Sequence, residues 1–152
     1  MTVGKLEGQN LAYNSLYSTI SKQMAKSKAN ILIFDTNKDG KLSMSELNVA
    51  KEKLPTMLVS DIGDVQFTKL NKKGKVVGRE QYNAENGDFI SSSSYEYDSK
   101  GRQSKIVNKD SSGMISTTTY SYHKNGNLSQ ERFVAGDDVI VFDYDNKGNL
   151  KP

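Results

Sequence analysis

The sequence contains no cysteine and no tryptophan, and it has only two prolines and one histidine in 152 residues. Without cysteine there can be no disulfide, no thiolate nucleophile and no cysteine-ligated zinc site. No stretch approaches the roughly 18 consecutive apolar residues of a membrane-spanning helix, so we expect no membrane span. The first ten residues also lack the apolar core of a signal peptide, so export would need a signal already removed or another route.

Positive charge is neither large nor segregated. The net charge is +3, with 8 lysines and 6 acidic residues in residues 1–62, and 13 basic and 12 acidic residues in residues 63–152. Nucleic-acid binding needs clustered positive charge, so this distribution argues against such a partner. The apolar fraction is 35%, and the remainder is rich in serine, asparagine, lysine and tyrosine. That composition suits an exposed antiparallel sheet with a thin core.

Residues 35–46 read Asp-Thr-Asn-Lys-Asp-Gly-Lys-Leu-Ser-Met-Ser-Glu, which spaces oxygen atoms as one calcium ion requires. Five candidate ligands are side chains at loop positions 1, 3, 5, 9 and 12: Asp35, Asn37, Asp39, Ser43 and Glu46. The sixth is the backbone carbonyl of Lys41 at position 7. At position 6, Gly40 allows the sharp turn around the ion, because glycine accepts left-handed backbone without a Cβ clash.

The loop resembles that of an EF-hand. The resemblance implies a Ca²⁺ cofactor and an apolar anchor at Leu42, which bridges to a second loop in paired EF-hands. Only one such loop is present, so we expect affinity in the weaker half of a range from about 10⁻⁹ to about 10⁻³ M. The alternative is a polar turn, because residues 37–42 are similar to residues 145–150. Those later residues lack the terminal glutamate.

Apolar residues flank the loop at steps of three and four, as on one face of a helix. Before it they predict a helix over about residues 9–34, with a break near the polar Ser27. After it, Leu47, Ala50 and Leu54 predict a second helix that ends at Pro55. Residues 1–8 are expected to be a flexible lead-in.

From about residue 64 the apolar period changes from 3.6 to 2, and an internal repeat begins. Polar turns ending in Gly74, Gly101, Gly126 and Gly148 recur at spacings of 27, 25 and 22 residues, with further glycines between them. Turns at this spacing predict an antiparallel meander of about seven or eight strands.

Aromatic residues precede three of these turns with the same parity. They are Tyr95, Tyr97, Tyr120, Tyr122, Phe142 and Tyr144. The strings Tyr-Glu-Tyr-Asp-Ser-Lys-Gly-Arg and Phe-Asp-Tyr-Asp-Asn-Lys-Gly-Asn-Leu resemble the YD repeats of bacterial surface and toxin proteins, and residues 120–150 also resemble MORN-like repeats of bacterial antitoxin-type proteins. The YD resemblance implies a secreted or cell-surface β-sheet. Its signature aspartate is replaced by His123 in one unit.

The six rings are expected to share one face of the sheet. Either they are buried against the helices or the opposite edge of a rolled sheet, or some stay exposed and bind a sugar or a protein.

Candidate catalytic residues are few in this sequence. The only histidine, His123, lies in a predicted turn, which leaves carboxylates such as Asp137 with Asp138, or Asp143 with Asp145, as candidates for a hydrolase.

The sequence therefore predicts an α+β protein, with a helical EF-hand unit over residues 1–62 and an antiparallel β-hairpin repeat region over residues 63–152. We expect a calcium-binding protein, not an enzyme, whose repeats bind a protein or glycan partner. The alternative is an immunity or antitoxin-type interaction protein in which calcium is only structural. A carboxylate-based hydrolase ranks third.

Overall fold

The structure is a computed structural model that describes residues 3–152, with side chains described from residue 11 onward. Two helices come first: α1 (Val3–Lys26) and α2 (Met44–Lys53), each followed by a short 3₁₀ helix, η1 (Ile31–Phe34) and η2 (Leu54–Thr56). The chain forms two compact units. We call residues 1–68 with 81–89 the helical unit, and residues 69–80 with 90–152 the repeat sheet.

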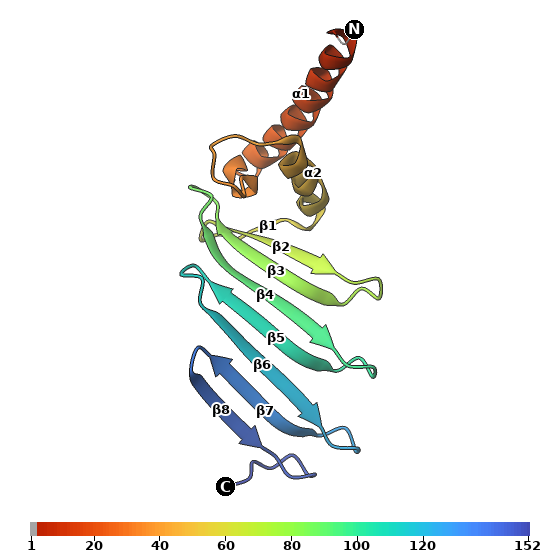
Figure 1. The fold of residues 1–152 in the computed structure, drawn as a ribbon, viewed down its shortest axis with the longest axis vertical. Coiled ribbons are helices and arrows are strands. Elements are labelled where there is room, and N and C mark those ends of the chain that lie inside the picture. Colours follow the sequence, from red (N-terminus) through yellow and green to blue (C-terminus); the bar gives the residue numbers. More distant parts are fainter. Residues whose placement is uncertain (1–2) are drawn as a thin grey trace. The chain divides into compact units, whose positions relative to one another are not determined.

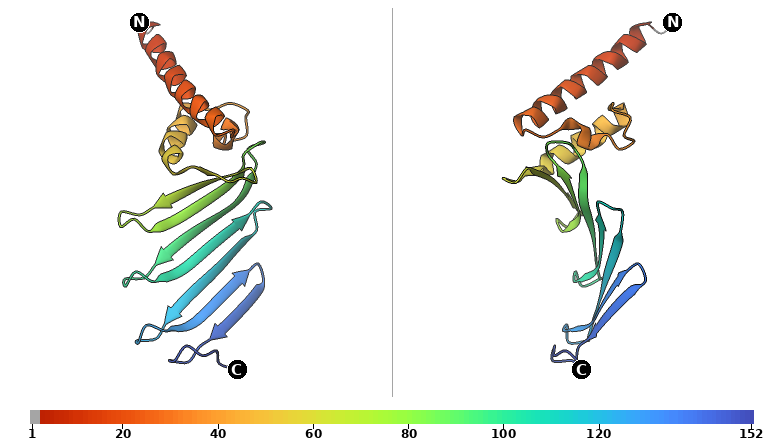
Figure 2. Two further views of the ribbon diagram at one scale, coloured as in Figure 1. Left: turned by 180° about the vertical axis from the view of Figure 1, so that it is seen from behind. Right: turned by 90° about the vertical axis from the view of Figure 1, so that its left-hand side faces the viewer.

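Eight strands follow the helices in one antiparallel sheet, and each strand neighbours the next in chain order (Figure 1). They are β1 (Leu58–Val59), β2 (Asp64–Leu70), β3 (Val76–Asn83), β4 (Phe89–Tyr97), β5 (Gln103–Asp110), β6 (Ile115–Tyr122), β7 (Leu128–Ala135) and β8 (Asp138–Asp143). The two views of Figure 2 show the same uninterrupted order. The α+β class and the meander are thus confirmed, as is the predicted number of strands.

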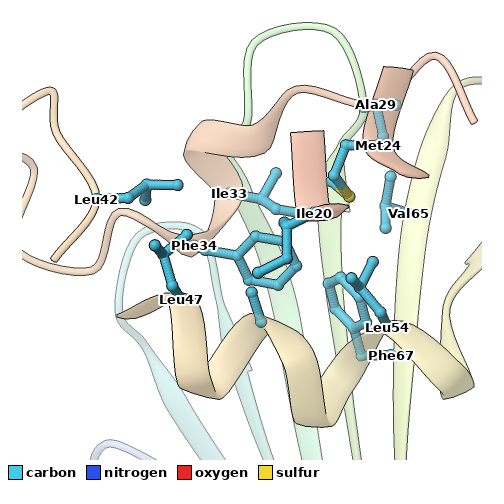
Figure 3. Close-up of a cluster of buried hydrophobic side chains, with 12 residues drawn as sticks. Ile20, Met24, Ala29, Ile33, Phe34, Leu42, Leu47, Leu54, Val65 and Phe67 are labelled. Atoms are coloured by element: carbon cyan, nitrogen blue, oxygen red, sulfur yellow. The ribbon is translucent and has the colours of Figure 1, made fainter. Parts of the chain in front are cut away.

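The buried core lies in the helical unit (Figure 3). On α1, Ile20 and Met24 are each 1% exposed, and on α2, Leu47 and Ala50 are fully buried. Phe34 of η1 contacts Phe67 of β2, with ring centroids 5.5 Å apart. The apolar spacing of three and four predicted from the sequence therefore does face the core on both helices.

The predicted break in the first helix is confirmed, since α1 ends at Lys26. The N–H of Lys28 donates to the carbonyl of Ala25, and the N–H of Ala29 to that of Met24, both at 3.0 Å. This is the pattern of a Schellman motif, whose left-handed residue is usually glycine. Here that residue is Lys28, with φ of 56°.

At the other end, α1 begins at Val3, so the expected flexible lead-in is wrong over residues 3–8. Residues 1 and 2 lie outside the described residues.

Replacing Lys28 by glycine should stabilise the helical unit. A side chain with a Cβ atom is strained in left-handed backbone, whereas glycine is not, so we expect the free energy of unfolding to rise by about 0.5–1 kcal/mol. Urea unfolding followed by far-UV circular dichroism measures this change. The matched variant Lys28→Ala keeps the Cβ atom and should show no gain, so equal stabilisation by both substitutions would contradict the explanation.

The repeat sheet has no core of this kind: none of its residues, 69–80 and 90–152, is buried. Its regular turns supply local order instead. In three of the four repeat turns the aspartate or asparagine three residues before glycine accepts two backbone N–H bonds, as Asp98 does from Lys100 and Arg102 at 2.9 Å each. His123 cannot accept in this way, and its Nε2 instead lies 2.9 Å from the carbonyl oxygen of Tyr144.

Tyrosines link successive repeats. The hydroxyl of Tyr97 donates to the carbonyl of Val76 at 2.6 Å, and one repeat later that of Tyr122 donates to Gln103 at 2.5 Å. A cation also lies over each ring: Lys75 Nζ is 4.6 Å from the Tyr97 centroid and the Arg102 guanidinium carbon is 4.2 Å from that of Tyr122. The rings are half-buried, because the cationic residue just after the previous repeat glycine covers them.

Replacing Tyr122 by phenylalanine should cost about 1 kcal/mol of unfolding free energy, because it removes the bond to Gln103 and keeps the ring under Arg102. Urea unfolding followed by near-UV circular dichroism measures the loss. The matched change is Tyr95→Phe, since Tyr95 contacts Arg79 through its ring alone. Similar losses in both variants would show that the hydroxyl bond is not the stabilising contact.

No helix among the described residues combines the length and apolar character needed to cross a membrane.

Candidate calcium-binding loop

Residues 35–43 form the loop between η1 and α2, so a single 3₁₀ turn, and not a long helix, leads into it. Gly40 has φ of 79°, in the left-handed region that the sequence assigned to it. Lys38 also adopts left-handed backbone, with φ of 60°. These two residues turn the chain tightly enough for side chains on both sides of the turn to bond to its backbone.

The first half of the loop is ordered by Asp35, Asn37 and Asp39. The carboxylate of Asp35 accepts the N–H of Gly40 at 2.9 Å and that of Asp39 at 3.3 Å. The side-chain oxygen of Asn37 accepts the N–H of Asp39 at 3.2 Å, and Asp39 in turn accepts the N–H of Lys41 at 2.9 Å. The predicted ligands at positions 1, 3 and 5 are therefore brought together around one stretch of backbone.

The second half is organised by Ser43 and Glu46. Ser43 is the N-cap of α2, and its hydroxyl accepts the N–H of Glu46 at 3.1 Å. Glu46 reciprocates by accepting the N–H of Ser43 at 2.9 Å, which completes a capping box. Its other oxygen accepts both the N–H and the hydroxyl of Thr36, at 2.6 and 3.1 Å. Glu46 thus ties the end of the loop to its beginning, beside Asp35.

These donors stabilise the ionised form of Glu46. Its pKa is lowered from 4.5 to about 2, chiefly by the backbone N–H of Ser43, with the Ser43 hydroxyl and both Thr36 groups adding to the effect and burial opposing it. Glu46 therefore carries a full negative charge in the folded protein at neutral pH.

The stability of the helical unit should fall in acid. Because the folded pKa of Glu46 lies below its unfolded value, the stabilisation is fully present above about pH 4.5 and is lost as the pH falls toward about 2. Urea unfolding in calcium-free buffer across this range measures the loss. Carboxylates in the repeat sheet, such as Asp98, also have a lowered pKa, so the quantity to follow is the difference in the free energy of unfolding between wild type and Glu46→Gln. If this difference stays constant across the pH range, Glu46 is not the group responsible.

Asp35 and Glu46 are the only buried charged side chains in the described part of the chain, at 5% and 6% exposure. No lysine or arginine among the described residues forms an ion pair with either of them. Buried carboxylates are normally paired with a cation. The donor set, made of oxygen atoms with three carboxylates, fits a hard divalent ion. Among the described residues, however, no three acidic or histidine side chains form a preassembled metal cluster.

The sequence did not indicate the role of two residues at the loop. Thr36 occupies a loop position that supplies no ligand, so nothing in the pattern indicated its bonds to Glu46. Tyr13 lies on the apolar stripe of α1, yet its hydroxyl donates to the carbonyl of Leu42 at 2.6 Å. Leu42 itself is 5% exposed and belongs to the core of this unit rather than bridging to a second loop.

The other candidate carboxylates lie at or just beyond the two ends of β8. Asp145 orders its own turn, accepting the N–H groups of Lys147 and Asn149 at 2.9 Å each. These bonds, those from Asn149 foremost, lower its pKa. Asp143 accepts the side-chain amide of Gln130 at 2.9 Å. Asp137 and Asp138 are exposed at the turn between β7 and β8.

Two rings of the predicted aromatic face line an open groove in the repeat sheet. Tyr95 and Tyr97 line it together, and the other lining residues are Lys75, Val76, Arg79 and Gln103. Burial raises the pKa of Tyr120 first of all, and the nearby Glu131, Tyr122 and Tyr144 add to this shift.

Comparison of the chain with models of protein families finds no match, and comparison with curated proteins finds none either.

Proposed function

We propose that this chain is a calcium-binding protein whose loop at residues 35–46 holds one Ca²⁺ ion in the manner of an EF-hand. The observation that supports this most directly is the burial of both Asp35, at the start of the loop, and Glu46, at its end, with no basic partner among the described residues. A divalent cation would supply the missing positive charge.

The ion would be held by side-chain oxygens of Asp35, Asn37, Asp39 and Glu46 and by the carbonyl of Lys41, with Ser43 acting directly or through a water molecule. Binding must compete with the bonds that already engage Glu46, namely those from Ser43 and Thr36. That competition, together with the presence of one loop instead of a pair, favours an affinity in the weaker half of the EF-hand range, about 10⁻⁶ to 10⁻³ M.

The ion would mainly stabilise the helical unit. Phe34, Leu42 and Leu47 stand just before, inside and just after the loop, and all three belong to the core. Holding the loop closed therefore holds these side chains in place. Calcium at about 100 times its dissociation constant would add roughly 2.7 kcal/mol to the free energy of unfolding.

Thermal unfolding of the intact protein, with calcium and with a chelator, tests the proposal. We expect a higher melting temperature for the helical unit with calcium, and a smaller effect of magnesium, which demands stricter octahedral geometry. An identical melting temperature at about 10 mM calcium, well above the weakest affinity of such loops, would overturn it.

We further propose that the repeat sheet binds a partner, as the resemblance to YD and MORN-like repeats suggests. The specific support is that the sheet buries no side chain of its own, so its surface is accessible along residues 90–152. An immunity or antitoxin-type role, with calcium only structural, would be supported if a protein or glycan partner binds wild type and Glu46→Gln equally without calcium. Binding by wild type only when calcium is present, with no binding by Glu46→Gln in either condition, would instead support calcium-dependent recognition.

A further inference from the structure

The open groove on the aromatic face of the repeat sheet carries positive charge and no negative charge. It lies across three neighbouring strands, β3, β4 and the start of β5 (Figure 1). Two of its six lining residues are cationic, Lys75 and Arg79, and none is acidic. All six belong to the repeat sheet, so the groove is formed within one compact unit.

Each cation is held over one of the two tyrosine rings of the groove. Lys75 Nζ lies 4.6 Å from the Tyr97 centroid and also donates to the carbonyl of Gly101. The Arg79 guanidinium carbon lies 5.9 Å from the Tyr95 centroid. The two tyrosines are two residues apart on β4, which corresponds to a rise of roughly 7 Å along the strand. The two positive charges are therefore set out along β4 at about this spacing.

The acidic residues nearest to the groove do not compensate these charges. Glu96 pairs with Lys105 at 3.5 Å, and Asp98 pairs with Arg102 at 2.8 Å. Glu80 follows the groove arginine on β3, so its side chain points to the opposite face. Neither groove cation forms an ion pair with any described residue. The segment that supplies both cations, residues 69–80, contains five basic residues and one acidic residue, a net charge of +4.

The groove also holds more hydrogen-bond donors than acceptors can satisfy. Within the described part of the chain, no acceptor bonds to the Arg79 guanidinium, the Tyr95 hydroxyl or the Gln103 side-chain amide. The hydroxyl of Tyr97 differs, since it donates to the carbonyl of Val76 at 2.6 Å. A guanidinium group binds a carboxylate through two parallel N–H bonds. The donors of the groove therefore suit a ligand that is rich in carboxylate oxygens.

The arrangement favours an acidic peptide over a nucleic acid or a sugar. Both tyrosine rings already have a cation over them, so they offer little free face for the stacking that bases and sugar rings need. An extended peptide presents alternate side chains on the same side, at a spacing of roughly 7 Å. Acidic side chains at two alternate positions thus match the two cations along β4.

We propose that this groove binds an extended acidic segment of another protein, with glutamate or aspartate at two alternate positions. One carboxylate would bond to the Arg79 guanidinium and the other to Lys75 Nζ. The Gln103 amide and the Tyr95 hydroxyl would donate to further oxygen atoms of the segment. This inference rests on the proposed partner-binding role of the repeat sheet, and it does not depend on the calcium loop.

Amide NMR spectra of the intact protein, titrated with the peptide Gly-Ser-Glu-Ser-Glu-Ser-Gly in chelator, test the proposal. The control peptide Gly-Ser-Ser-Glu-Glu-Ser-Gly has the same composition but places the two glutamates side by side. At low ionic strength we expect shifts at the residues that line the groove, and binding of the alternating peptide at least about threefold tighter, with both affinities falling as salt is added. Equal binding of the two peptides would overturn the proposal.

Three variants locate the site. Arg79→Gln removes a positive charge at an exposed position, so it should weaken binding of the alternating peptide about fivefold. Arg132→Gln makes the same change at an exposed position of β7 and should bind within about twofold of wild type. Arg79→Glu should reverse the preference, from the glutamate peptide to its lysine counterpart. Equal losses in the two glutamine variants would overturn the groove as the binding site.

Other occupants give different results. A single-stranded oligonucleotide or a sulfated oligosaccharide of equal charge that binds the groove more tightly than the alternating peptide would overturn the proposal in favour of that class. Sedimentation of the free protein tests a second copy of the chain, whose Asp143 and Asp145 are also two residues apart. Self-association abolished by Arg79→Glu would overturn the proposal in favour of that second copy.

The same spectra keep this inference separate from the others. Calcium binding is followed through the amide of Gly40, whose N–H bonds to Asp35. Calcium shifts without peptide shifts reject this inference alone, and peptide shifts at the groove without calcium shifts reject only the calcium proposal. Peptide shifts confined to other strands of the repeat sheet would keep its partner-binding role and reject the groove.

Discussion

Replacing Glu46 by glutamine is expected to weaken calcium binding at least about 100-fold. The substitution removes the negative charge and the bidentate carboxylate at position 12, and affinity in such loops follows the number of charged ligands. Glutamine can still serve in a capping box, so α2 should keep its N-terminus. Its amide can accept from Ser43 or from Thr36 but not from both as the carboxylate does, so the calcium-free variant should also be somewhat less stable.

The matched control for this variant is Glu52→Gln, the same chemical change at an exposed position of the same helix. Isothermal titration calorimetry with calcium compares both variants with wild type. We expect wild-type affinity for Glu52→Gln. Equal loss of affinity in the two variants would mean that overall charge, and not coordination by Glu46, attracts the ion.

Replacing Leu47 by alanine should cost about 2–5 kcal/mol of unfolding free energy, the largest effect on stability that we expect for one residue. Leu47 is completely buried and lies in the first turns of α2, directly after the loop, among side chains from α1 and η1 (Figure 3). The substitution leaves a cavity there that the surrounding helices can only partly fill. Urea unfolding followed by far-UV circular dichroism measures the loss.

Val49→Ala is the control for Leu47→Ala, because Val49 lies on the same helix but is 40% exposed. It should change the free energy of unfolding by less than about 0.5 kcal/mol. If calcium binds the folded loop, a concentration of about 100 times the dissociation constant should restore roughly 2.7 kcal/mol to Leu47→Ala. Comparable losses in the two variants would show that α2 does not pack as described.

The features that the sequence predicted best are those in which one residue has one local task. Gly40 turns the loop, and the apolar residues of α2, such as Leu47, face the core. In the repeats, the glycines of the turns mark the hairpins because they adopt left-handed backbone, as Gly126 does with φ of 95°. Such residues are recognisable because few others can replace them.

What the sequence did not predict depends on pairs of residues far apart in the chain. Tyr13 bonds to Leu42 across 29 positions, and Tyr122 bonds to Gln103 across 19. Arg102 contacts the Tyr122 ring only because β5 brings the two repeats into register. Lys28 at the end of α1 is a different case, since a lysine gives no signal that its backbone is left-handed. Register and tertiary contact, rather than composition, decide these features.

Isothermal titration calorimetry of the wild-type protein with calcium tests the central claim most directly. The account predicts one ion bound per chain, with a dissociation constant between about 10⁻⁶ and about 10⁻³ M, and weaker binding of magnesium. Absence of any binding heat up to about 10 mM calcium, at two temperatures, would contradict it. The buried carboxylates of Asp35 and Glu46 would then be satisfied by hydrogen bonds within the loop alone.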